Sequence, residues 1–154
     1  MPRLRDTTSV ECSAERAQAA LWAFLLSLRG RDGVARLRLR VPTDGAPHGY
    51  GLSFDREVRI EARAVRNDEH RKELVQIRWA PEGTTVFPTF EGTLTIRGEN
   101  PASPSHLELD GAYTPPFGIA GQVFDAAIGH RIAKATAREF LKDVKRAIEG
   151  AAPE

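Results

Sequence analysis

The sequence has the size and composition of a single globular domain, with 154 residues of which 41% are hydrophobic and 28% charged. These values exclude collagen-like, disordered and membrane-spanning classes of protein. The 22 Lys and Arg residues nearly balance the 21 Asp and Glu residues, so a net charge of +1 gives no general attraction to nucleic acid. The absence of a long apolar run and of a secretory signal pattern predicts a cytoplasmic protein without stable membrane insertion.

The first two predicted elements are a strand over residues 7–13 and a helix over residues 14–29. Apolar residues of the helix recur at steps of three and four, with Ser13 as the N-cap and Gly30 as the stop. Cys12 is the only cysteine, which excludes an internal disulfide and a cysteine-rich metal site. We interpret Cys12 as a small hydrophobic residue on the strand.

An antiparallel meander is predicted over residues 34–114, because apolar and polar residues alternate strictly through several strands separated by turn residues. Such alternation indicates a sheet with one covered face and one wet face, which antiparallel strands allow. On the polar face, Arg36, Arg38 and Arg40 form a basic run. We interpret this run as a solvated face balanced by acids on neighbouring strands, and the alternative is a phosphate-binding strip.

A long helix is predicted over residues 119–150, after Pro115 and Pro116 end the last strand. The N-terminal half of its apolar stripe carries small residues, so we expect an apolar cavity between helix and sheet near Trp79, Phe90 and Tyr113. The residues predicted to line this ligand site are Val58, Ile60, Ile77, Trp79, Phe90, Leu94, Leu109, Tyr113, Val123, Ala127 and His130.

The stretch FPTFEGTLTI and the following LELDGAYTPPFGIAGQVFDAAIGHRIAKATAREFLKDVKRAIE are the most distinctive parts of the sequence. Together with the order of elements, they resemble the START-like, or SRPBCC, superfamily, which includes birch-pollen-allergen-like proteins and polyketide cyclases. Many bacterial members have a similar corner, represented here by Gly111, Tyr113, Pro115, Pro116, Gly118 and Asp125. The N-terminal part departs from the family pattern, because the usual second short helix is not evident.

The resemblance implies an α+β helix-grip fold. In this fold, a curved antiparallel sheet of about six strands wraps around a long C-terminal helix, and a shorter helix follows the first strand. It also implies a hydrophobic cavity between the sheet and the C-terminal helix, which the superfamily uses for lipids, polyketides or aromatic compounds. The whole chain, residues 1–154, is then a single START-like domain.

Three functions are compatible with these observations. The first, which we favour, is a non-catalytic protein that binds or transports a hydrophobic small molecule. The second is a cyclase or aromatase in which Tyr113 and His130 polarise a carbonyl group. The alternative for His130 is a core histidine hydrogen-bonded to Tyr113 or to a backbone carbonyl, or a histidine at the edge of the apolar stripe. The third is a protein-interaction module with a collapsed cavity.

No cofactor and no metal site are predicted, since the remaining histidines, His48, His70 and His106, are well separated in the sequence. No catalytic residue is assigned beyond the weak candidates Tyr113 and His130. The sequence is compatible with both a monomer and a homodimer.

Overall fold

The computed structural model describes residues 3–41, 54–67, 72–81, 89–98, 104–114 and 126–151. They form six strands and two helices: β1 (Arg3–Val10), α1 (Ala14–Ser27), β2 (Ala35–Val41), β3 (Phe54–Asn67), β4 (Lys72–Pro81), β5 (Thr89–Arg97), β6 (Ser105–Thr114) and α2 (Ala126–Ala151).

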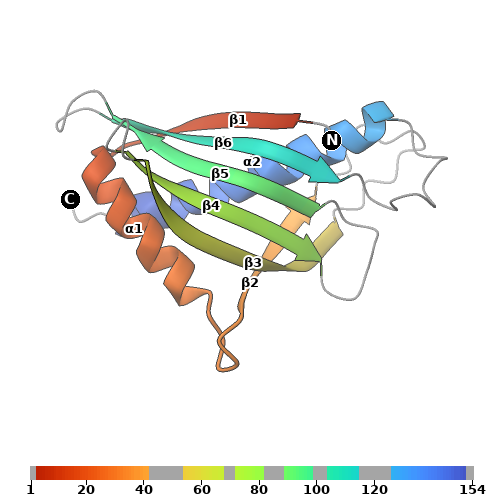
Figure 1. Ribbon diagram of the computed structural model, residues 1–154, viewed down its shortest axis with the longest axis horizontal. Helices are drawn as coiled ribbons and strands as arrows, with labels where there is room; N and C mark the ends of the chain where they lie inside the picture. Colours follow the sequence, from red (N-terminus) through yellow and green to blue (C-terminus); the bar gives the residue numbers. More distant parts are fainter. Residues whose placement is uncertain are drawn as a thin grey trace.

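All six strands belong to one antiparallel sheet in the order β1–β6–β5–β4–β3–β2. The sheet curls around α2, which packs against both edge strands, β1 and β2, while α1 crosses one end of the sheet (Figure 1). The predicted α+β helix-grip architecture is therefore confirmed. Neither described helix is both long and apolar enough to span a membrane.

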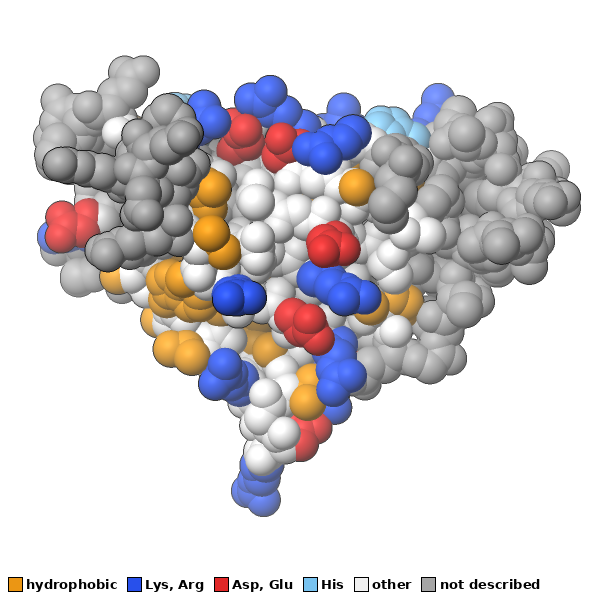
Figure 2. All heavy atoms as spheres, viewed as in Figure 1, with side chains coloured by type: hydrophobic (Ala, Val, Ile, Leu, Met, Phe, Trp, Pro, Cys, Tyr) orange, Lys and Arg blue, Asp and Glu red, His pale blue; other side chains and the backbone are white. Residues whose placement is uncertain are grey.

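The predicted division of the sheet into an apolar and a polar face is confirmed. Inward residues from β3 to β6 are buried: Val58, Ile60, Val75, Ile77, Trp79, Phe90, Leu94, Ile96, Leu107, Leu109 and Tyr113. On the outer face, Arg78 of β4 lies directly opposite Glu61 of β3 and Glu91 of β5. Figure 2 shows this face with positive and negative side chains intermixed. Opposite charges on neighbouring strands stabilise such a wet face by a few tenths of a kcal/mol per pair.

The basic run on β2 has acidic neighbours, as the solvated-face interpretation expects. Arg36 forms an ion pair with Asp32 at 2.9 Å, and Arg38 lies directly opposite Glu57 of β3. The pKa of Asp32 is lowered, first by its hydrogen bond with Arg36. The charges of this strand are thus matched within the sheet and the turn that precedes it.

The predicted bounds of the first strand are wrong. β1 covers Arg3–Val10 rather than residues 7–13, because Leu4 is buried and the strand pairs with β6 from Arg3 onward. The chain bends after Val10, so Cys12 lies beyond the strand and is half-buried. Burial raises the pKa of its thiol, which disfavours the reactive thiolate.

The helix predicted over residues 14–29 is confirmed, although it ends at Ser27. Ser13 is its N-cap, and the side-chain oxygen accepts a hydrogen bond from the Arg16 backbone N–H at 3.3 Å. Of the second predicted helix, the structure describes Ala126–Ala151, and the predicted start at residue 119 lies outside the described residues. From Ala133 onward, the inward face of α2 is buried: Ala133, Thr136, Ala137, Phe140, Leu141, Val144 and Ile148.

Candidate functional site

An aromatic cluster occupies the space between the sheet and α2. Trp79 of β4 lies directly opposite Phe90 of β5, and their rings stack with centroids 4.5 Å apart and planes 22° apart. Phe140 of α2 approaches Trp79 with a centroid distance of 5.0 Å. All three side chains are buried. The cluster therefore connects the inner face of the sheet to the helix across the whole interior.

Two glycines make room for the Phe90 ring. Gly92 of β5 lies directly opposite Gly111 of β6, so neither strand carries a side chain at this point of the inner face. A Cβ atom on Gly92 would lie 2.7 Å from the Phe90 Cζ atom, and one on Gly111 would lie 2.8 Å from it. The ring thus packs directly against the sheet backbone, which is a close approach that only glycine permits.

A small gap lies next to this cluster. The residues that line it are Leu4, Trp79, Thr89, Phe90, Tyr113, Ala133 and Thr136, and they leave too little space for a water molecule. The small residue Ala133 leaves space on the helix, as the sequence predicts, but the large side chains of the sheet fill it. Two other predicted walls of this cavity, Val123 and the side chain of Ala127, lie outside the described residues, so the cavity near Trp79, Phe90 and Tyr113 stays a prediction.

The indole N–H of Trp79 is the exceptional polar group of this interior. Trp79 is 1% exposed, and its Nε1 atom has no hydrogen-bond partner within the described part of the chain. A buried donor without an acceptor costs about 1–3 kcal/mol. An aromatic side chain without a polar group would avoid that cost, so the donor needs an explanation.

Tyr113 and His130 meet at the edge of the gap. The Tyr113 hydroxyl lies 3.0 Å from His130 Nδ1, so the two side chains form the hydrogen bond that was one of the alternatives for His130. Burial raises the pKa of Tyr113, so this side chain is a neutral phenol at physiological pH. The phenol can donate to an unprotonated Nδ1 or accept a hydrogen bond from a protonated one.

His130 itself is exposed, although its helical position belongs to the inward stripe. In Figure 1, the N-terminal end of α2 extends past the end of β6. Tyr113, which is near the end of β6, reaches the ring while remaining buried itself. The pair therefore connects the closed interior to the surface.

Several solved structures share this arrangement of strands and helices. A protein from Thermus thermophilus is 16% identical, with a TM-score of 0.55 over 99% of this chain and 100% of that one. A conserved protein from Geobacillus kaustophilus is 11% identical, with a TM-score of 0.56 over 97% of each chain. The ZhuI aromatase/cyclase from Streptomyces sp. R1128 is 15% identical, with a TM-score of 0.53 over 97% of this chain and 92% of that one.

The chain has the START-like, helix-grip fold. No family model and no curated protein sequence matches it. The sequence identities to the solved structures are low, so the likeness establishes the START-like fold and leaves the ligand and any reaction to be argued from this chain's own residues.

The START-like interior brings the predicted strand residues together. Eight of the predicted site residues lie buried on the inner face of the sheet: Val58, Ile60, Ile77, Trp79, Phe90, Leu94, Leu109 and Tyr113. His130 is at the edge of this group, whereas Val123 and the side chain of Ala127 lie outside the described residues. Within the described ranges, no three His, Cys, Asp or Glu side chains are placed to hold a metal ion.

Three contributors to the START-like interior were missed by the sequence reasoning. Phe140 completes the aromatic cluster, and Leu4 and Thr136 line the gap. The sequence pattern of α2 does place Phe140 next to the apolar stripe of the helix, so its helical position could have identified it as an inward residue. Leu4 stands between two arginines, and its burial depends on the pairing of β1 with β6.

Proposed function

We propose that the protein binds a hydrophobic small molecule that carries a hydrogen-bond acceptor, in the interior between the sheet and α2. The observation that supports this proposal best is the buried Trp79 Nε1 donor without a partner among the described residues. An acceptor on the ligand, such as a carbonyl oxygen, would satisfy it in surroundings that are otherwise apolar and aromatic. Lipids, polyketides and aromatic compounds with an oxygen function belong to this class.

Binding requires the interior to open, because the gap that the described residues leave beside Trp79 is too small for a water molecule. The proposed entrance is the end of the interior where Tyr113 meets His130, since this pair connects the buried gap to the exposed turn of α2. Movement of Phe90 or Tyr113 would create space without unfolding the sheet. The ligand would then bind an open conformation of the protein that is less populated when no ligand is bound.

The Trp79→Phe substitution tests the proposal. We expect the free energy of unfolding to fall by about 1–2 kcal/mol, because the lost packing of the larger ring outweighs the removal of an unsatisfied buried donor. Retention of the natural ligand should fall at least tenfold, because the ligand loses its hydrogen-bond donor. Native mass spectrometry of protein purified gently from its own cells, compared with the denatured mass, measures the retained ligand.

Trp22→Phe is the matched control, because it makes the same chemical change at a half-buried position on α1 that does not line the gap beside Trp79. Equal ligand retention by both variants would contradict a role for Trp79. A ligand-free mass for the unmodified protein, under conditions that preserve weak complexes, would contradict small-molecule binding and favour a START-like fold with a collapsed interior.

The Tyr113–His130 contact favours a second candidate, a cyclase-type enzyme acting on a polyketide-like substrate. Tyr113 would polarise a substrate carbonyl through its phenol, and His130 would hold the phenol in position. In that case, a ligand identified by mass spectrometry should be converted into a product of altered mass. Tyr113→Phe should slow this conversion at least a hundredfold, and a ligand that is recovered unchanged after prolonged incubation would exclude the enzyme.

A further inference from the structure

Helix α1 has two apolar stripes, and the described residues cover the second one only in part. Ala17, Leu21 and Leu25 are buried against the core. Trp22 and Leu26 lie one position further along the helix; Trp22 is half-buried, and Leu26 is 57% exposed. Leu26 is the one large hydrophobic side chain in the described ranges that is exposed. A helix that is apolar on more than one face is normally covered on those faces, so the second stripe lacks its partner.

The exposed stripe is part of a hydrophobic patch on the surface. Figure 2 shows apolar side chains gathered over the region where Figure 1 places α1 beside the sheet. Contiguous exposed apolar surface with a polar rim is typical of interaction sites.

A free strand edge lies beside this patch. β2 pairs with β3 only as far as the register pair Ala35 and Ile60, whereas β3 continues to Asn67. On its other side, β3 pairs with β4 over its whole remaining length, ending with Asn67 opposite Lys72. In the described part of the chain, residues 61–67 of β3 are therefore paired on one side only. Their free backbone groups can receive a further strand.

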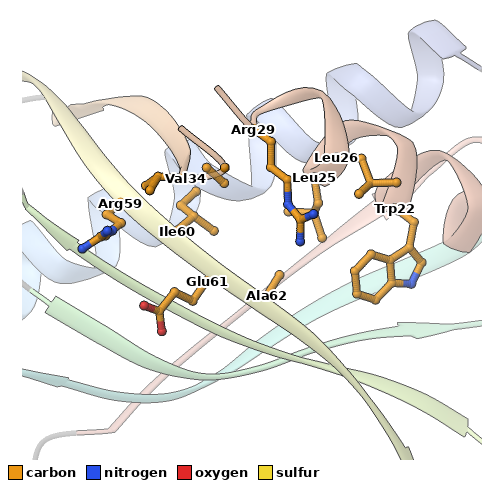
Figure 3. A pocket seen from close by; sticks show the side chains of 11 residues that line it. Trp22, Leu25, Leu26, Arg29, Val34, Arg59, Ile60, Glu61 and Ala62 are labelled. Atoms are coloured by element: carbon orange, nitrogen blue, oxygen red, sulfur yellow. The ribbon is translucent and has the colours of Figure 1, made fainter. Parts of the chain in front are cut away.

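A groove separates this strand edge from α1. Its volume is about 270 Å³, and it is open to solvent along one side. Trp22, Leu25 and Leu26 of α1 form one wall, and Ile60 and Ala62 of β3 form the other (Figure 3). The groove and the gap beside Trp79 have no lining residue in common, so the occupant of the groove is distinct from the proposed small-molecule ligand.

The rim of the groove is positively charged. Figure 3 shows the Arg29 side chain extending from the end of α1 toward β3, with Arg59 and Glu61 at the strand. Arg29 and Arg59 form no ion pair with another described residue. Two arginines against one glutamate line the groove, and this excess of positive charge favours an occupant with carboxylate groups.

We propose that this groove binds an extended, acidic segment of a partner protein, which adds to the free edge of β3 as a seventh strand of the sheet. Backbone hydrogen bonds to residues 61–67 hold the segment, an apolar side chain enters the groove between Trp22 and Ala62, and flanking carboxylates meet the arginines. The free strand edge and the unpartnered helix stripe are two independent features, and a single extended segment covers both.

Selection from a displayed library of random peptides, each about a dozen residues long, tests this proposal. Enriched peptides should carry Asp or Glu around one or two large apolar residues. A synthetic copy of the best peptide should bind at least tenfold more weakly to Leu26→Glu than to the unmodified protein. Thr7→Glu is the control, because it makes the same change of charge at an exposed position on β1, at the opposite edge of the sheet.

The peptide backbone distinguishes strand addition from other binding modes. Successive amides of an added strand point alternately toward β3 and away from it. N-methylation of one alternating set of peptide amides should therefore abolish binding, while methylation of the other set should leave it nearly unchanged. In addition, the bound peptide should slow amide hydrogen exchange in residues 61–67 of β3.

Three results would overturn the proposal. The first is that peptides are enriched no more strongly on the unmodified protein than on the Leu26→Glu variant. The second is equal sensitivity to both methylation sets. The third is a dimer of the unmodified protein, measured by light scattering, that Leu26→Glu converts into a monomer, since this would assign the groove to a second copy of the chain. Normal circular dichroism and an unchanged Tm of Leu26→Glu show that the variant is folded.

Discussion

Replacing Gly92 with alanine is expected to lower the free energy of unfolding by about 3 kcal/mol or more, or to prevent folding altogether. The added Cβ atom would overlap the backbone carbonyl oxygen of Asp110 and lie 2.7 Å from the Gly111 Cα atom. Both atoms belong to the neighbouring strand β6, which cannot move without breaking its pairing with β5. Urea denaturation followed by circular dichroism measures the loss.

The control for this substitution is Gly150→Ala. Position 150 lies in α2, and an added Cβ atom would meet no atom within 4 Å. Alanine is the better helix former, so this variant should be at least as stable as the unmodified protein. The double variant Gly92→Ala with Phe90→Leu should recover little stability, because the overlap with the β6 backbone remains. A Gly92→Ala protein with the normal denaturation midpoint would contradict the close packing of β5 on β6.

Replacing Phe140 with alanine is expected to cost about 3–5 kcal/mol, the usual range for removing a buried aromatic ring. Phe140 is 0% exposed and packs on Trp79 across the interior. Its removal would leave a cavity next to the proposed ligand site. Apolar cavities of this kind bind small aromatic molecules, so saturating benzene or indole should raise the Tm of the variant more than that of the unmodified protein.

Phe24→Ala provides the comparison for this prediction. Phe24 is on α1 and is only partly buried, so the same change there should cost clearly less. A loss of stability below about 1 kcal/mol for Phe140→Ala would show that the ring does not fill the interior. A large loss without any response to benzene or indole would show that the surrounding side chains collapse into the space.

The sheet was predictable from the sequence because its two faces differ in chemistry. Alternation alone distinguishes Val75, Ile77 and Trp79 from Gln76 and Arg78 on β4, and all three apolar residues are buried. The alternation is less informative near strand ends. Ala64 has the inward phase on β3, yet it is exposed, because β2 does not extend beside this part of the strand.

The candidate site was only partly predictable, because its shape depends on contacts between distant elements. The sequence identifies Trp79, Phe90 and Phe140 as apolar aromatic residues, but their stacking depends on the register of β4 with β5 and on the rotation of α2. The size of the gap beside Trp79 was not predictable for the same reason. A local sequence pattern does not show how closely side chains from two distant elements pack. The unsatisfied Trp79 donor likewise follows from the three-dimensional surroundings.

Strand β1 is the element whose formation depends on the most distant part of the chain. It pairs with β6, and its residue Arg3 contacts Asp110 at a separation of 107 positions. It also packs against α2, which is still later in the sequence. During synthesis, β2 to β5 can form hairpins with their neighbours as they emerge. In contrast, β1 can pair and pack only after β6 and α2 have been synthesised. Contacts between residues that are far apart in the sequence form late, because they require a long loop to close. The docking of β1 should therefore be the slow, final step of folding.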